Sequence, residues 1–236
     1  MDIPRYLAMT AAEFWSAPAL TEHVAWMACH FSSYGTGLSN LPTELPPDSM
    51  VILNDRIPFL GHDPERILAQ MEEIVNSFHP NAILLDLQRP DIPPVANIAK
   101  LLAQKLPCPV GITEAYAKDL SCPVFLEAPI DQALEEALSV WKGREIWLDI
   151  APAGGVITVT SDTSEFQPDC LEFGENPVFT DEKLCCRYQT QIGEDFIRFL
   201  LRRDPEDMAF LLEVAEKLGV TRAVGLYQQL GTDMEN

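Results

Sequence analysis

The chain has 236 residues, of which 47% are hydrophobic and 22% are charged, and its mean hydropathy is +0.01. These values are typical of a globular protein, and no apolar run approaches the ~18 consecutive residues that a membrane-spanning helix needs. The 36 acidic residues outnumber the 16 basic ones, and the resulting formal charge of -20 repels nucleic-acid phosphates and anionic lipid. We therefore expect neither a nucleic acid nor a membrane as a partner.

The N-terminus and the cysteines both favour a cytoplasmic location. The first residues, MDIPRYLAMTAAEFW, contain an early acid and an early proline but no basic segment followed by an apolar one, unlike a secretory signal. The six cysteines include no CxxC pair and are too few for a disulfide scaffold. We expect reduced thiols.

Eight short apolar segments have the pattern of strands that are buried on both faces of a parallel sheet. In chain order these predicted strands are 24–31, 50–55, 82–87, 109–113, 123–127, 145–150, 156–160 and 184–189. For the first 20 residues the sequence suggests at most a short helix.

Several segments between these strands carry helix signals. The clearest begins with Asp63 as N-cap and Pro64 at the first helical position, and its apolar residues recur at the helical spacing up to Phe78. Similar signals predict further helices, at 92–106, 129–141, 193–203, 204–219 and 221–231. Strands that alternate with helices are typical of α/β architecture.

Eight predicted strands with helices between them favour a (β/α)8 TIM-type barrel. A doubly wound sheet is less favoured, because no glycine-rich phosphate loop follows the first strand. We expect one barrel domain over residues 1–236. Residues 114–122 are too few for a full helical crossover, and residues 150–183 have little helical periodicity. The expected barrel is therefore irregular, with outer helices missing between strands 4 and 5 and between strands 6 and 8.

Acidic residues follow six of the eight predicted strands, where a barrel of this type carries its functional face. Carboxylates accept hydrogen bonds from hydroxyl groups, and aromatic rings pack on the C–H faces of sugars. The mouth of the barrel is therefore expected to bind a carbohydrate or a similar polar small molecule. The candidate binding residues are Asp86, Gln88, Arg89, Asp55, Tyr34 and Tyr188.

The segment AILLDLQ, residues 82–88, carries the most specific signal. Asp86 and Gln88 are two residues apart, so both side chains point into the barrel if Leu84 does. The segment resembles the strand-end signature of the chitinase-like family 18 glycoside hydrolases, an Asp-x-Glu on the fourth barrel strand. In that family the Glu is the general acid and the Asp assists the acetamido group of the substrate. The resemblance implies a glycoside hydrolase-like barrel in which Asp86 matches that Asp and Gln88 replaces the acid.

Two departures from the signature bear on activity. Gln88 has no acidic proton to donate at neutral pH, so the resemblance implies sugar binding without that family's protonation step. The strand that carries Asp86 is also the third predicted strand and not the fourth. If the barrel is nevertheless an enzyme, Glu114 with Asp149 or Glu127 would form the two-carboxylate set of a glycosidase, and we take Glu114 and Asp149 as the catalytic candidates.

Two other interpretations stay open. In a non-catalytic binding or scaffold protein, the acids at the mouth would brace the rim as ion pairs with arginines such as Arg56 and Arg89. In a metal-dependent hydrolase, Asp55, Asp86 and His30 would converge on one point. The four histidines have no HExxH or HxH spacing, so we expect neither a metal nor a cofactor, and the oligomeric state stays open.

Overall fold

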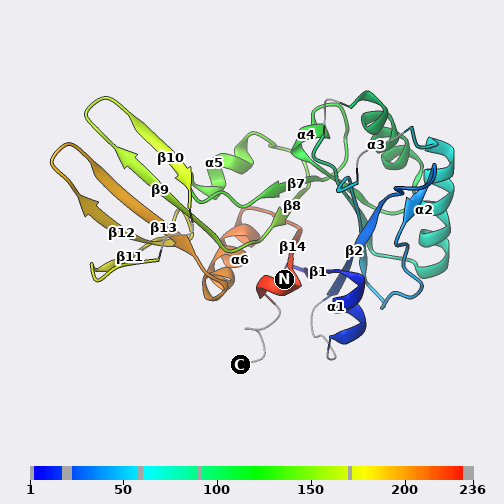
Figure 1. The fold of residues 1–236 in the computed structure, drawn as a ribbon, viewed down its shortest axis with the longest axis horizontal. Helices are drawn as coiled ribbons and strands as arrows, with labels where there is room; N and C mark the ends of the chain where they lie inside the picture. The colour runs from blue at the N-terminus through cyan, green and yellow to red at the C-terminus, as the bar shows by residue number, and fades with distance from the viewer. Residues whose placement is uncertain (1–2, 18–22, 58–60, 90–91, 170–171, 231–236) are drawn as a thin grey trace.

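A closed barrel of eight parallel strands forms the centre of the fold (Figure 1). The computed structural model describes residues 3–17, 23–57, 61–89, 92–169 and 172–230. The barrel strands are β1 (Arg5–Met9), β2 (His23–Phe31), β4 (Met50–Asn54), β5 (Ala82–Asp86), β6 (Val110–Thr113), β7 (Val124–Glu127), β8 (Ile146–Asp149) and β14 (Arg222–Leu226). Strand β1 pairs with both β14 and β2 and so closes the ring, and the short β3 (Leu38–Ser39) adds antiparallel to β2. The predicted (β/α)8 barrel is confirmed.

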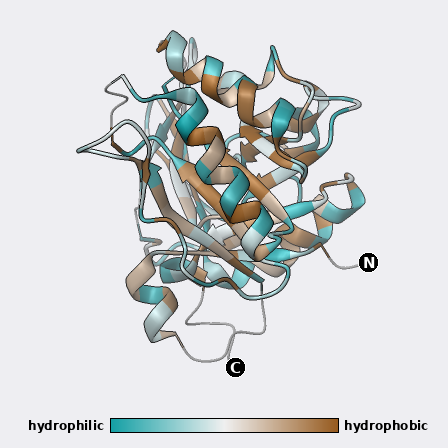
Figure 2. Cartoon of the chain, turned by 90° about the vertical axis from the view of Figure 1, so that its right-hand side faces the viewer, coloured by the Kyte–Doolittle hydropathy of each residue, from teal (hydrophilic) through white to brown (hydrophobic). Residues whose placement is uncertain are grey.

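The helices follow the sequence signals closely on one side of the barrel. The Asp63 side chain accepts a hydrogen bond from the Glu65 amide (3.1 Å) and caps α2 (Pro64–Phe78), and α3 (Pro93–Lys105) follows β5. In Figure 2, which views the molecule from this side, hydrophilic and hydrophobic residues alternate along the helices. The remaining helices are short: α1 (Ala11–Ser16), α4 (Glu114–Ala117), α5 (Leu134–Ser139), the 3-10 turn η1 (Pro205–Asp207), α6 (Met208–Lys217) and α7 (Tyr227–Leu230).

A second sheet is inserted between β8 and β14. It is antiparallel, has the order β10-β9-β13-β12-β11, and lies beside the barrel in Figure 1; we call it the inserted sheet. Its strands are β9 (Ala153–Val159), β10 (Ser164–Pro168), β11 (Val178–Asp181), β12 (Cys186–Ile192) and β13 (Ile197–Arg203). The inserted sheet explains the lack of helical periodicity over residues 150–183, and the single turn of α4 explains the short connection after β6.

Five segments were wrongly assigned. The segments 156–160 and 184–189 are strands, but they lie in the inserted sheet, and 193–203 contains β13 and not a helix. The missing barrel strands are β1 and β14, in segments for which the sequence suggested only helices. Apolar runs as short as these fit a strand or a buried helix equally well, so the elements that pack against them in the fold decide which of the two forms. Because β1 precedes β2, β5 is the fourth barrel strand, as in the family 18 signature.

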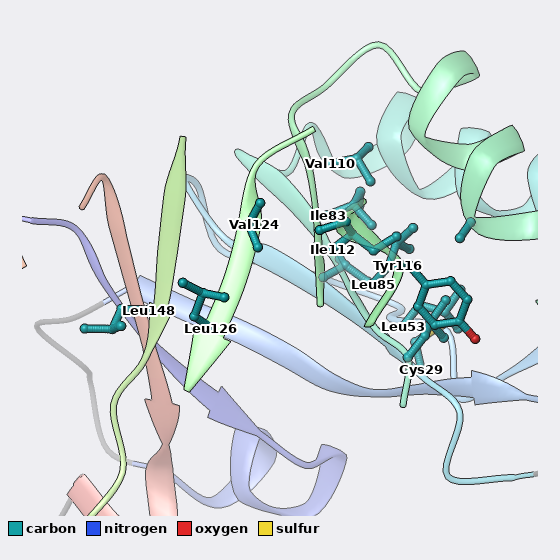
Figure 3. Close-up of a cluster of buried hydrophobic side chains, with 14 of the residues drawn as sticks. Cys29, Leu53, Ile83, Leu85, Val110, Ile112, Tyr116, Val124, Leu126 and Leu148 are labelled. Atoms are coloured by element: carbon teal, nitrogen blue, oxygen red, sulfur yellow. The ribbon is translucent and has the colours of Figure 1, made fainter. Parts of the chain in front are cut away.

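The barrel has an inner and an outer apolar layer. The inner layer consists of Tyr6, Ala8, Ala25, Met50, Ile52, Ala82, Leu84, Phe125, Trp147 and Val224. The outer layer packs the strands against the helices, as Figure 3 shows for residues such as Leu53, Leu85 and Tyr116. Since Leu84 belongs to the inner layer, Asp86 at the end of the same strand points into the barrel.

The described cysteines are free thiols, and Cys29, Cys185 and Cys186 among them are buried. Cys170 lies outside the described residues. Within the described ranges, no helix is both long enough and apolar enough to cross a membrane.

Replacing Gly111 with alanine is expected to destabilise the barrel interior. A Cβ atom at Gly111 would lie 2.2 Å from atoms of the fully buried Trp147 ring. The overpacking should lower the free energy of unfolding by about 1–3 kcal/mol, as measured by urea denaturation. Gly35→Ala is the control, because its nearest neighbour would be 3.7 Å away. Equal stabilities of the two variants would contradict this account of the packing.

Candidate functional site

Three carboxylates end barrel strands and face the same space at the mouth. Asp86, Glu127 and Asp149 are the last residues of β5, β7 and β8. Each lies two residues after a member of the inner layer, so each side chain points inward. Glu127 and Asp149 are also direct partners in the register of β7 and β8. Because neighbouring strands lie ~4.8 Å apart, these two carboxyl groups are close neighbours.

The segment after β5 is held in place by its neighbours. The Gln88 side-chain amide donates a hydrogen bond to Oδ1 of Asp86 (2.8 Å), and the Gln88 backbone N–H donates to Oδ2 of the buried Asp55 (2.9 Å). The hydroxyl of Tyr116 donates to the backbone carbonyl of Arg89. Thus Asp55 orients the backbone of Gln88, and Gln88 in turn orients Asp86.

Burial raises the pKa of two of the acids at the mouth, Asp86 and Asp149. The pKa of Asp149 is raised to about 7, mainly by burial and in addition by the nearby charges of Glu127 and Asp86. The pKa of Asp86 is also raised, mainly by burial, although the hydrogen bond from Gln88 opposes the shift. Asp149 therefore carries a proton for much of the time at neutral pH and can donate it in a hydrogen bond.

A groove of about 1010 Å³ adjoins the mouth. Gln88 and Glu127 line it at the barrel. The loop 128–132 after β7, residues in and next to α4 and α5, and the β9–β10 edge of the inserted sheet form most of the remaining wall. Its aromatic side chains are Trp141 and Phe166. The sequence did not indicate this groove, because the groove depends on the inserted sheet, which was not predicted.

The structure brings only some of the predicted site residues together. Asp55, Asp86 and Gln88 form one hydrogen-bonded group beside Asp149. The exposed Glu114 is the first residue of α4 and lines the groove, but strand β7 stands between its strand and that of Asp149. Glu127 is therefore the neighbour of Asp149. The alternation of inward residues along 123–127 is the sequence signal that indicates it.

The two predicted tyrosines differ in their position relative to the barrel. Tyr34 is fully exposed in the loop after β2. Tyr188 was expected at the end of the eighth barrel strand, which is wrong, because its strand β12 belongs to the inserted sheet. Its ring lies between Phe179 and Phe199, with ring centroids 5.5 and 6.2 Å away.

Arginines do not neutralise the acids at the mouth. In the described part of the chain, Asp86, Glu127 and Asp149 form no salt bridge with a basic side chain. Arg144 donates to the backbone carbonyls of Ala117 and Cys122. Arg187 is paired with acids near the start of α6, namely Asp204, Glu206 and Asp207.

The metal-dependent alternative required Asp55, Asp86 and His30 to converge on one point. His30 contacts the carbonyl of Phe31 (2.7 Å) and the side chain of Asn40 (3.1 Å) through its two ring nitrogens. Among the residues that the structure describes, no group of three His, Cys, Asp or Glu side chains is placed to hold a metal ion.

Comparison with known proteins identifies the fold. No family model matches the sequence, and no curated protein matches it. The structure is similar to a chitinase from Chromobacterium violaceum ATCC 12472, with 8% identity, a TM-score of 0.57, and coverage of 97% of this chain and 95% of that one. It is similar to a family 18 N-acetylglucosaminidase from Paenibacillus barengoltzii (7% identity, TM-score 0.55, coverage 99% and 96%). It is also similar to human YKL-39, a pseudo-chitinase with retained chitooligosaccharide binding properties (10% identity, TM-score 0.52, coverage 94% and 92%). The chain thus shares the (β/α)8 barrel fold of these proteins.

Proposed function

We propose that the mouth of this barrel binds an oligosaccharide and does not hydrolyse it by the family 18 mechanism. The observation that carries the proposal is the hydrogen bond from the Gln88 amide to Asp86 (2.8 Å), at the end of the fourth barrel strand. An amide at this position can donate to and accept from sugar hydroxyls, but it has no acidic proton for a leaving group.

The surroundings of this pair support a sugar site. Asp86 accepts hydrogen bonds, and the partly protonated Asp149 both donates and accepts them, which suits the hydroxyl groups of a sugar. The groove beside the mouth provides Trp141 and Phe166 as apolar surfaces for sugar rings. A pseudo-chitinase of the same fold that retains chitooligosaccharide binding gives a precedent for binding without turnover.

Sugar binding should be visible as a rise in the melting temperature of the protein. In a panel of neutral and amino-sugar oligosaccharides, at least one ligand near 100 times its Kd should raise the melting temperature by about 5 °C or more, because it binds only the native state. Asp86→Ala should lose this rise relative to its own ligand-free value. Glu73→Gln, an exposed change on α2, is the control. The absence of a shift with every sugar, or an equal shift in Asp86→Ala, would refute the proposal.

A second candidate function is hydrolysis through another pair of carboxyl groups. The raised pKa of Asp149 suits a general acid, and Glu127 or Glu114 would be the second carboxylate. The release of reducing ends from a chitooligosaccharide measures this directly. We expect no release above background. Turnover that Asp149→Asn abolishes would replace the binding proposal by the enzymatic one.

A further inference from the structure

The groove beside the barrel mouth is strongly asymmetric in charge. Four carboxylates line it, from Glu114, Glu127, Asp131 and Glu136, whereas Lys118 is the only basic residue among its described lining residues. Asp86 and Asp149 lie at the mouth next to it, where Glu127 and Asp86 both act on the charge of Asp149. A ligand that lies in the groove therefore meets a negative potential along it.

The same groove also has apolar walls. Val140 and Trp141 follow α5, and Phe166 and Pro168 come from β10 of the inserted sheet. Such surfaces pack on the C–H faces of sugar rings, and an aromatic ring also attracts a cation placed over its face. A ligand that matches both features has flat apolar faces and positive charges at intervals.

We propose that the oligosaccharide of this site is built from amino sugars whose amino groups are free and protonated. This inference rests on the proposed function and narrows it to de-N-acetylated oligomers. An acetylated amino sugar is neutral, so the four carboxylates attract it only through hydrogen bonds, while an acidic sugar is repelled by them. A protonated amine close to a carboxylate is attracted to it, and this attraction is stronger near a protein surface than in bulk water.

Isothermal titration of the full chain with two matched hexamers, at about pH 6, tests the charge preference. The glucosamine hexamer should bind about tenfold or more tightly than the N-acetylglucosamine hexamer, and raising the salt from about 0.05 M to about 0.5 M should reduce that advantage because salt screens exposed charges. Binding of the acetylated hexamer that is equal or tighter would overturn this inference and leave the proposed function intact. If neither hexamer binds and no other sugar binds, this inference and the proposed function both fail.

A double variant of two exposed groove residues tests whether the groove carboxylates cause the charge preference. Asp131→Asn combined with Glu136→Gln should reduce the preference for the glucosamine hexamer about fivefold or more, because two of the four groove carboxylates are lost. Glu135→Gln is the control, since Glu135 is exposed on α5 beside Glu136 but does not line the groove. An unchanged preference in the double variant would overturn the inference.

A cationic peptide could meet the same carboxylates, so a lysine hexamer is titrated in parallel. It lacks the ring faces that the apolar walls accommodate, and we expect it to bind at least about tenfold more weakly than the glucosamine hexamer. A lysine hexamer that binds as tightly would overturn the assignment of the groove to a sugar.

Discussion

Replacing Arg203 with methionine should lower the free energy of unfolding by about 3–5 kcal/mol. The Arg203 side chain is 1% exposed and donates hydrogen bonds only to backbone carbonyls in the described structure. The four acceptors are Cys185 (2.9 Å), Leu184 (2.7 Å), Ala128 (3.1 Å) and Pro129 (2.6 Å). The residue thus ties the end of β13 both to the turn before β12 and to the loop after β7. Methionine fills a similar volume but removes the donor of four carbonyl acceptors, two of them in buried hydrogen bonds and two in part-buried ones.

Urea denaturation measures this effect, and Arg202→Met is the control. Arg202 lies next in the chain, but its side chain is 37% exposed and pairs with Asp204 near the surface (2.7 Å). Exposed ion pairs contribute little, so the control should lose less than about 1 kcal/mol. Ala128 and Pro129 line the groove, so Arg203→Met should also weaken ligand binding. A loss in Arg203→Met no larger than in the control would refute the bridging role.

Asp149→Asn is expected to stabilise the protein at alkaline pH, by ~2–4 kcal/mol at about pH 8. Burial beside Glu127 and Asp86 raises the folded-state pKa of Asp149 to about 7, so the folded state resists its ionisation. The unfolded chain releases this proton near pH 4, and wild-type stability therefore falls as the pH rises from about 4 to about 7. The neutral asparagine removes this penalty.

Unfolding curves at a series of pH values test the prediction. The two proteins should have similar stability near pH 4 and differ increasingly up to about pH 7, with a constant difference above it. Glu114→Gln is the control, because this exposed carboxyl group should change stability by less than about 0.5 kcal/mol. A difference that does not depend on pH would contradict the raised pKa. Stabilisation by removal of a charge would fit a residue that is retained for binding or catalysis.

Local patterns in the sequence determined the class of the fold and part of the site. Six of the eight barrel strands, the capped helix after Asp63 and the short connection after β6 are all encoded within a few residues of each element. The period of two along a strand likewise placed Asp86 and Gln88 on the inner face. Such features depend on residue spacing, capping residues and the apolar pattern along one segment, and all three can be read from a single sequence.

Only the tertiary structure decided which strands close the barrel and what surrounds its mouth. Strands β1 and β14 are joined by hydrogen bonds between the two ends of the chain, and β9 and β12 have the same local pattern as barrel strands but pair in the inserted sheet. The proximity of Glu127 to Asp149 and the groove along the inserted sheet follow from these pairings. Pairing partners lie far apart in the chain, and a short apolar run does not specify its neighbour. The same is true of the pKa of Asp149, because its burial and its neighbouring charges exist only once the barrel has formed.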